Sequence, residues 1–182
     1  MDDEEEEHHG LHDAIEHFFG GAWLTGAAQP EPKSQGRIKL VADVTLRRGE
    51  AVLLVKYRDV RRYDGQTGWF LPDDYLRRSE HPLDAGLRIL REQAGVDVAE
   101  LDFGFVESFE GGADWHIVFH LTGQADDGTQ LTPGDNTEAA RWFDASALPA
   151  RDEVAHDGWA LDILSVLTRP REQAAQVRSV AE

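Results

Sequence analysis

The sequence of 182 residues contains no cysteine, and this absence excludes several kinds of chemistry. Without thiols the chain can form no disulfide, no thiolate metal site and no cysteine nucleophile. Lysine is also scarce, because 3 lysines and 15 arginines face 35 acidic residues and give a formal net charge of −17. Such an acidic surface repels nucleic acid unless a local basic patch is present. We therefore expect no nucleic-acid partner.

Long apolar runs are absent as well. No stretch of about 18 apolar residues occurs, so we expect no membrane-spanning segment. The N-terminal MDDEEEEHH is the reverse of the positively charged start of a secretory signal, and we expect a cytoplasmic protein. Many carboxylates with few lysines resemble halophilic proteins, for which molar salt shortens the screening length to ~3 Å. The alternative is an ordinary acidic protein.

The composition changes along the chain and predicts three regions. Residues 1–36 contain the acidic run, a short amphipathic helix and the linker AAQPEPKSQG. A domain follows at residues 37–168, and residues 169–182 form a tail. The sequence leaves open whether the N-terminal helix covers the domain, exchanges with a second copy in a homodimer or stays free. Its apolar face is formed by Leu11, Ile15, Phe18 and Phe19.

Within the domain, strands outnumber helices. Segments rich in Val, Leu and aromatic residues are separated by turns, which predicts strands. In one of them Trp115, Ile117 and Phe119 face one side, while His116 and His120 face the other and can reach a pocket. Helices lie at intervals among the strands, which indicates an α/β sandwich. The predicted strands are 37–46, 51–57, 69–71, 102–109, 114–123 and 138–144, and a helix is predicted at 158–167.

The clearest local prediction is a helix from Pro82 to Ala94. Proline suits the first helical position, and Gly95 suits the left-handed position that ends a helix. An apolar stripe predicts the face that packs on the core. This stripe comprises Leu83, Leu87, Leu90 and Ala94, whereas Arg88, Ile89, Glu92 and Gln93 are expected on the other side.

The loop and helix from Asp74 to Val96 resemble the Nudix box, G-x5-E-x7-R-E-U-x-E-E-x-G-U, in which U is aliphatic. Glu80, Arg88 and Glu92 take the positions of the first Glu, the Arg and the first of the Glu pair, without any gap. The resemblance implies a Nudix-like α/β/α sandwich with a mixed central sheet. It also implies hydrolysis of nucleoside diphosphate-linked substrates with Mg²⁺ or Mn²⁺, and catalytic roles for the three matched residues. Trp69–Pro72, Arg141–Phe143 and Ala147–Pro149 resemble segments that flank the box.

Three positions depart from the box. Asp74 replaces the opening Gly, Ile89 replaces the Glu after the Arg, and Gln93 replaces the second Glu of the pair. In the family these glutamates bind the metal, and Mg²⁺ requires oxygen ligands in near-octahedral geometry. Isoleucine supplies none and glutamine only a neutral oxygen. We therefore expect weak or lost hydrolase activity.

A shifted metal site is one alternative. Asp74, Glu92 and a strand carboxylate such as Glu107 could together supply ligands. The competing interpretation is that Asp73 and Asp74 are surface acids of a very acidic protein. Likewise, Glu80 and Arg88 could simply pair with neighbouring charges and hold the loop on the helix.

A locally basic loop provides a candidate phosphate clamp. Arg58, Arg61 and Arg62 lie in VKYRDVRRYDGQTG, and arginine binds phosphate oxygens bidentately. The alternative is that these arginines pair with surface acids. Two functions therefore remain open, a Nudix-type pyrophosphohydrolase and a non-catalytic Nudix fold that binds a nucleotide-like small molecule or a protein partner.

Overall fold

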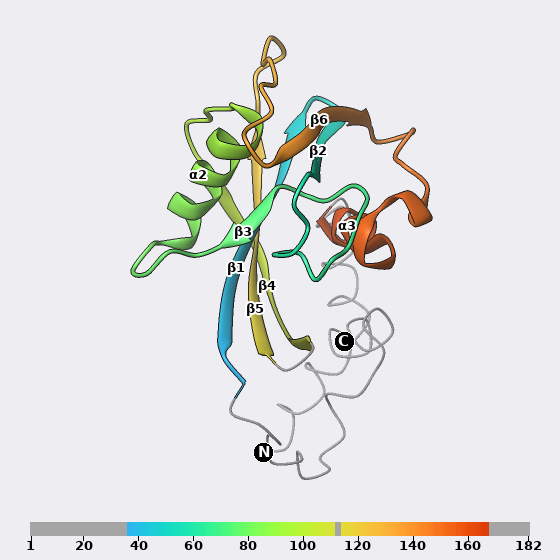
Figure 1. Cartoon of the computed structure of the whole chain (residues 1–182). Helices are drawn as coiled ribbons and strands as arrows, with labels where there is room; N and C mark the ends of the chain where they lie inside the picture. Colours follow the sequence, from blue (N-terminus) through green and yellow to red (C-terminus); the bar gives the residue numbers. More distant parts are fainter. Residues whose placement is uncertain (1–35, 112–113, 168–182) are drawn as a thin grey trace, which may run out of the picture. The chain divides into compact units, whose positions relative to one another are not determined.

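A mixed β-sheet forms the centre of the described domain (Figure 1). The computed structural model describes residues 36–111 and 114–167, and Gly36–Thr168 form one compact unit. The predicted N-terminal helix and the C-terminal tail lie outside the described residues. In the described part the sheet has six strands in the order β4-β5-β1-β2-β6, and β3 pairs with β1. Among the pairs of described strands, β1–β5 is parallel and the other four are antiparallel, so the predicted mixed sheet is confirmed.

The strands follow the predicted segments with one exception. Trp69 and Phe70 make isolated bridges to Val154 and Val55 and do not form a strand, so the prediction of a strand at 69–71 was wrong. The short strand starts at Asp73, where the backbone pairs with β1. The strands are β1 (Ile38–Arg48), β2 (Ala51–Tyr57), β3 (Asp73–Tyr75), β4 (Asp102–Gly111), β5 (Asp114–Gln124) and β6 (Thr137–Asp144).

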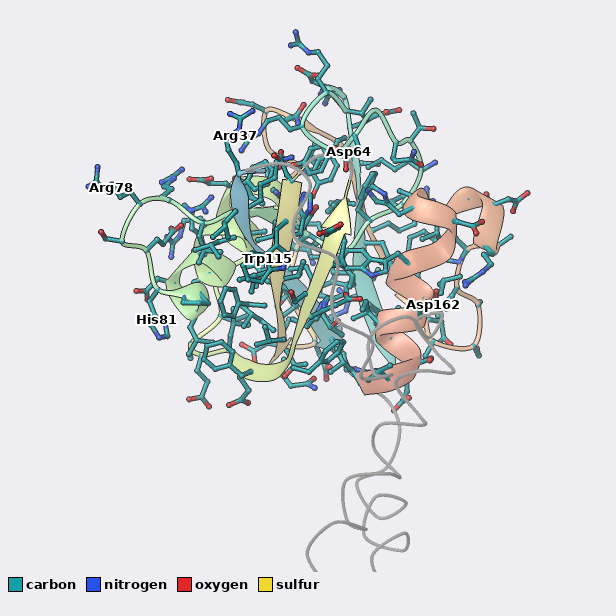
Figure 2. All side chains as sticks on the ribbon, turned by 90° about the horizontal axis from the view of Figure 1, so that it is seen from below. Arg37, Asp64, Arg78, His81, Trp115 and Asp162 are labelled. Atoms are coloured by element: carbon teal, nitrogen blue, oxygen red, sulfur yellow. The ribbon has the colours of Figure 1, made fainter. Side chains whose placement is uncertain are left out.

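Two helices cover opposite faces of this sheet in the described part of the chain (Figures 1 and 2). Helix α2 (Pro82–Ala94) has the predicted bounds, and Gly95 ends it in the left-handed conformation with φ of 66°. Its N-terminus is capped by His81, whose side chain accepts a hydrogen bond from the backbone N–H of Leu83. Neither helix is long and apolar enough to cross a membrane.

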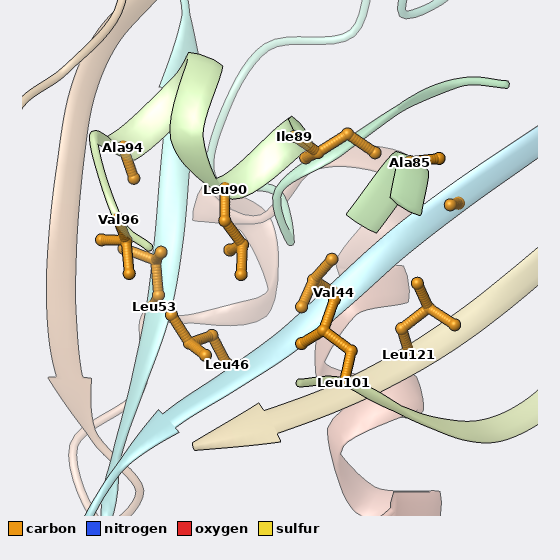
Figure 3. Close-up of a cluster of buried hydrophobic side chains, with 11 residues drawn as sticks. Val44, Leu46, Leu53, Ala85, Ile89, Leu90, Ala94, Val96, Leu101 and Leu121 are labelled. Carbon is orange, nitrogen blue, oxygen red and sulfur yellow. The ribbon is translucent and has the colours of Figure 1, made fainter. Parts of the chain in front are cut away.

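Helix α2 packs on the sheet through a face that differs from the predicted stripe. Ile89 and Leu90 are fully buried against Val44 and Leu121 (Figure 3). Leu83 and Leu87 are only partly buried and lie at the margin of this cluster. The expectation that Ile89 lies away from the core was therefore wrong. Tertiary packing on β1 and β5 turns the apolar Ile89 inward, because its burial removes a large apolar surface from water.

Helix α3 (Ala155–Leu167) covers the other face. It follows a short 3₁₀ helix, η1 (Arg151–Glu153), and contains a kink at 156–158, where all three residues have positive φ. Regular helix follows Gly158, as the sequence predicted. Ile163 and Leu164 are buried in a second core cluster with Leu54 and Trp69. The kink matters for the site, because it brings the start of α3 to the pocket described below.

Candidate functional site

Arg88 lies at the centre of a cluster of carboxylates between the loop and α2. Its Nε and Nη2 atoms donate to the two carboxylate oxygens of Glu80 at 2.7 and 2.9 Å. Its Nη1 atom lies 3.2 Å from oxygens of both Asp74 and Glu92. Nη2 also donates to the carbonyl of Tyr75 at 3.1 Å. The side chain of Arg88 is only 9% exposed, so this guanidinium is held by its partners and not by water.

Two further arginines, which are more exposed than Arg88, pair with carboxylates of the same cluster. Arg62 donates to Asp74 at 2.6 Å, and Arg77 donates to Glu92 at 2.8 Å. Three guanidinium groups thus face three carboxylates, and the formal charges of the cluster cancel. The hydrogen bonds from Arg88 hold the pKa of Glu80 below its usual range, in spite of partial burial. Each candidate carboxylate therefore already has a cationic partner within the protein.

Gln93 belongs to a second network, with Tyr57 and Asp73. The Gln93 nitrogen donates to the Asp73 carbonyl at 2.7 Å, which fixes the amide so that its oxygen faces the Tyr57 hydroxyl at 2.8 Å. Tyr57 has one proton and must donate it to Gln93, because an amide oxygen can only accept. The Asp73 oxygen 2.8 Å from the same hydroxyl must then carry a proton itself. Consistent with this, burial raises the pKa of Asp73 to about 8.

A buried histidine on β5 contacts carboxylates from the two neighbouring strands. His120 is fully buried, and its Nδ1 atom lies 2.8 Å from Asp43 on the neighbouring strand. Its Nε2 atom lies 3.3 Å from Glu107 on β4. Burial lowers the pKa of His120, but Asp43 and Glu107 outweigh burial and raise it to about 9. His120 is therefore a buried cation that bridges two carboxylates.

A pocket of about 360 Å³ lies between β3, β4, β5 and the start of α3. Its lining combines acidic side chains with aromatic rings. Asp73 and Asp74 contribute from β3, Glu107 and Phe109 from β4, and His116 from β5. The remaining lining residues are Val41, Arg62, Tyr63, Asp64, Tyr75, Gly111, Val118, His156 and Trp159.

The structure separates the predicted metal ligands into two environments. Asp74 and Glu92 meet at Arg88, whereas Glu107 is bonded to His120 on the other side of the pocket. Among residues 36–111 and 114–167, no group of three or more His, Asp or Glu side chains is arranged to hold a metal ion. Ile89 offers no donor atom, because it is an apolar side chain buried in the core. The described side chains, in these positions, do not fit a Mg²⁺ or Mn²⁺ ion.

The three arginines of the predicted phosphate clamp do not converge on one site. Arg62 lines the pocket, but it is already paired with Asp74. Arg61 is paired with Asp59, which lowers the pKa of that carboxyl to about 2, and Arg58 donates to the carbonyl of Asp135. Neither Arg58 nor Arg61 belongs to the pocket lining.

Sequence reasoning placed His116 near a pocket but missed Phe109, His156 and Trp159. The alternation of β5, with His116 and His120 on one face, was the available signal for that side of the pocket. His156 and Trp159 could not be found in this way, because they arrive from α3 after the kink. Trp115 lies on the opposite face of the sheet, as the alternation predicted, and is 43% exposed.

Three solved structures with a similar fold are distant in sequence. A MutT/nudix family protein from Enterococcus faecalis matches with 18% identity and a TM-score of 0.59 over 76% of this chain, which spans 63% of that protein. The Ap4A hydrolase of C. elegans, in a binary complex, matches with 14% identity and a TM-score of 0.54, covering 78% of this chain and 98% of that one. A bifunctional NMN adenylyltransferase/ADP ribose pyrophosphatase from Francisella tularensis, complexed with AMP and a Mn ion, matches with 15% identity and a TM-score of 0.57, covering 74% and 42%. These similarities show the fold.

Sequence comparison gives the family directly. No curated protein sequence matches the chain. The family model described as NUDIX domain matches residues 37–162, which is most of the chain and includes the whole of the loop and helix around Arg88. The chain therefore belongs to the Nudix family.

Proposed function

We propose that this Nudix protein binds nucleoside diphosphate-linked small molecules and hydrolyses their pyrophosphate bond weakly or not at all. One observation carries the proposal: Asp74, Glu80 and Glu92 are each paired with arginine, and the three charges are neutralised within the protein. A divalent ion would have to displace Arg88 from these carboxylates. Members of the family generally use such an ion, which stabilises charge and activates water, each effect lowering the barrier by several kcal/mol.

The proposed class of ligand is based on the names of similar solved structures. Two of the similar structures carry names that refer to Ap4A and ADP ribose, and one of them holds AMP. Both compounds contain an adenosine joined through phosphates to another group. This chain keeps a pocket of about 360 Å³ beside the loop and helix of the box, which is large enough for a small ligand.

A second candidate is an active hydrolase with a shifted metal site. Its motivation is that the side chain of Glu92 is 47% exposed and can leave Arg88 without disturbing the core. In that case Glu80, Arg88 and Glu92 would be the catalytic residues, and Asp74, Glu92 and Glu107 would hold Mg²⁺ or Mn²⁺. Arg58, Arg61 and Arg62 would then bind the substrate phosphates.

A single assay separates the two candidates. The purified protein is incubated with Mg²⁺ or Mn²⁺ and with nucleoside triphosphates, ADP-ribose, dinucleoside polyphosphates and NADH, with Glu92→Gln in parallel. We expect no turnover above the rate of Glu92→Gln, because the loss of two ligands costs several powers of ten in rate. Metal-dependent turnover in the ordinary enzyme range, about 1–10³ s⁻¹, that Glu92→Gln abolishes would overturn the proposal in favour of the active hydrolase.

A further inference from the structure

Aromatic side chains form much of the pocket lining. Six of its fourteen lining residues are aromatic, namely Tyr63, Tyr75, Phe109, His116, His156 and Trp159. Its volume of about 360 Å³ is near the lower end of the range for small-molecule sites, roughly 300–1,000 Å³. Aromatic walls of this size suit one planar ring system with small substituents, because flat rings stack on aromatic faces.

The walls are held in place by stacking among themselves. Phe109 and His116 lie nearly parallel, with ring centroids 5.2 Å apart and an interplanar angle of 11°. Tyr63 stacks on Tyr57 at 3.9 Å and 4°. A ring that enters the pocket therefore meets surfaces that are already ordered, which lowers the entropy lost on binding.

The pocket also contains a buried polar atom without a partner. His116 is only 7% exposed, and within the described residues its Nδ1 atom makes no hydrogen bond. Buried polar atoms of this kind are nearly always hydrogen-bonded in folded proteins. Since His116 lines the pocket, a ring nitrogen of a ligand is a suitable partner for this atom.

The charge of the lining selects against phosphate. Among the described lining residues, the carboxylates of Asp64, Asp74 and Glu107 outnumber Arg62, which is already paired with Asp74. The other cationic partners of Asp74 and Glu107, which are Arg88 and His120, lie outside the lining. A diphosphate placed among these carboxylates would be repelled unless a cation bridged them. An N–H donor is favoured instead, because an ionised carboxylate only accepts hydrogen bonds. Glu107 is suitably placed: one of its oxygens contacts His120, and within the described residues the other has no hydrogen-bond partner.

We propose that this pocket binds the planar, amine-bearing ring of the ligand, that Glu107 accepts a hydrogen bond from the exocyclic amine, and that the phosphates remain outside. The inference rests on the proposed nucleotide-like ligand but needs neither metal nor turnover. In a diphosphate site the carboxylates would hold a metal ion, whereas in this pocket they would face the ring of the ligand.

The test uses two neutral probes that differ only in the amine. Adenosine carries it and purine riboside lacks it. Calorimetric titration of the full chain with each probe is carried out in Mg²⁺ and again in EDTA. We expect adenosine to bind with the same Kd in both buffers, and purine riboside to bind about tenfold more weakly, as expected for the loss of a hydrogen bond to a charged group.

Variants identify the partner of the amine. Glu107→Gln keeps the shape of the side chain and removes its charge, and it should weaken adenosine about tenfold while leaving purine riboside within threefold. Glu110→Gln is the matched control on the same strand, because Glu110 is exposed and pairs with Trp115 on the opposite face of the sheet. His116→Phe keeps the ring stacked on Phe109 and should weaken both probes. Melting temperatures establish that each variant is folded.

Two results would overturn the inference. The first is adenosine binding that is absent in EDTA and restored by Mg²⁺, which would show that the ring does not bind without a metal ion. The second is an equal affinity of the two probes, or an equal loss for both probes in Glu107→Gln. Turnover of a diphosphate compound in the separate assay would contradict the proposed function and would leave the ring assignment standing, so the two failures are distinguishable.

Discussion

The side-chain oxygen of Gln93 accepts a hydrogen bond from Tyr57 at 2.8 Å, while its nitrogen donates to the carbonyl of Asp73 at 2.7 Å. Gln93, one of the departures from the Nudix box, and Asp73, the residue before the box, are thus joined in one closed network. A glutamate at position 93 could not donate to that carbonyl and would bring a negative charge beside Asp73. Glutamine at position 93 is therefore favoured by its two partners, the Asp73 carbonyl and the Tyr57 hydroxyl.

Gln93→Glu is expected to lower the free energy of unfolding by about 1–3 kcal/mol at pH 8, because it leaves the Asp73 carbonyl without its donor. Urea denaturation measures the effect. Gln130→Glu is the matched control, since Gln130 makes an exposed bond to Gly128 and its change should be within about 0.5 kcal/mol. Equal stability of Gln93→Glu and the parent would show that the network contributes nothing.

Arg88→Met should destabilise the protein by about 3–5 kcal/mol, because it leaves Asp74, Glu80 and Glu92 facing one another with their central cation removed. The variant should also gain a response to metal: MnCl₂ should raise its melting temperature more than NaCl at matched ionic strength. The parent should show no such difference.

Arg91→Met provides the control for that experiment. Arg91 lies on the same helix and pairs with Asp97, but both side chains are largely exposed. Its loss should change stability by no more than about 1 kcal/mol. If Arg88→Met behaved like Arg91→Met, the guanidinium of Arg88 would not be holding the cluster together.

Stability should fall as the pH rises from 6 to 9.5. The folded-state pKa of His120 is raised to about 9 from 6.5, so its contribution is full below pH 6.5 and is lost as the pH rises through 9. The pKa of Asp73 is raised to about 8 from 3.8, so the folded state also holds this extra proton and loses stability up to pH 8. The two effects have the same sign.

Denaturation curves at both pH values measure this loss, which we expect to be on the order of several kcal/mol. His120→Gln should be less stable than the parent at pH 6 and should show a shallower dependence on pH. A parent protein that is more stable at pH 9.5 than at pH 6 would contradict the charge assigned to His120.

Gly134→Ala should destabilise the protein by about 1–3 kcal/mol. A Cβ atom at this position would lie 1.8 Å from the carbonyl oxygen of Glu92, so the loop before β6 would have to move away from the end of α2. Gly128→Ala, in the same loop, would place its Cβ more than 4 Å from any other group and should be near neutral. Thermal unfolding of the two variants gives the comparison directly.

Local patterns predicted the elements but not the partners of their side chains. The bounds of α2 follow from Pro82 and Gly95, which act within one turn of the chain. The burial of Ile89 depends on β1 and β5, so helical periodicity alone assigned it to the wrong face. The Glu80–Arg88 pair was among the alternatives because eight residues separate them across one loop.

The long-range contacts of the site were beyond such reasoning. Tyr57 reaches Gln93 across 36 residues, and Asp43 reaches His120 across 77. The sheet order brings Asp43 to His120, since β1 pairs with β5. The packing of α2 on the sheet brings Gln93 to Tyr57 of β2. The strand-to-strand register therefore carried information about the site that no motif contained.

The burial of Ile89 also restricts how this chain can change over evolutionary time. A glutamate there would place a carboxylate in a cluster with Val44 and Leu121, at a cost comparable to much of the typical stability of a domain, about 5–15 kcal/mol. Restoring that one box residue would therefore unfold the protein before it could restore chemistry, unless neighbouring core residues changed first. Further substitutions that improve the packing around Ile89 would increase the destabilisation caused by a glutamate at this position. A return to a full metal-binding box would therefore become less accessible with each of them.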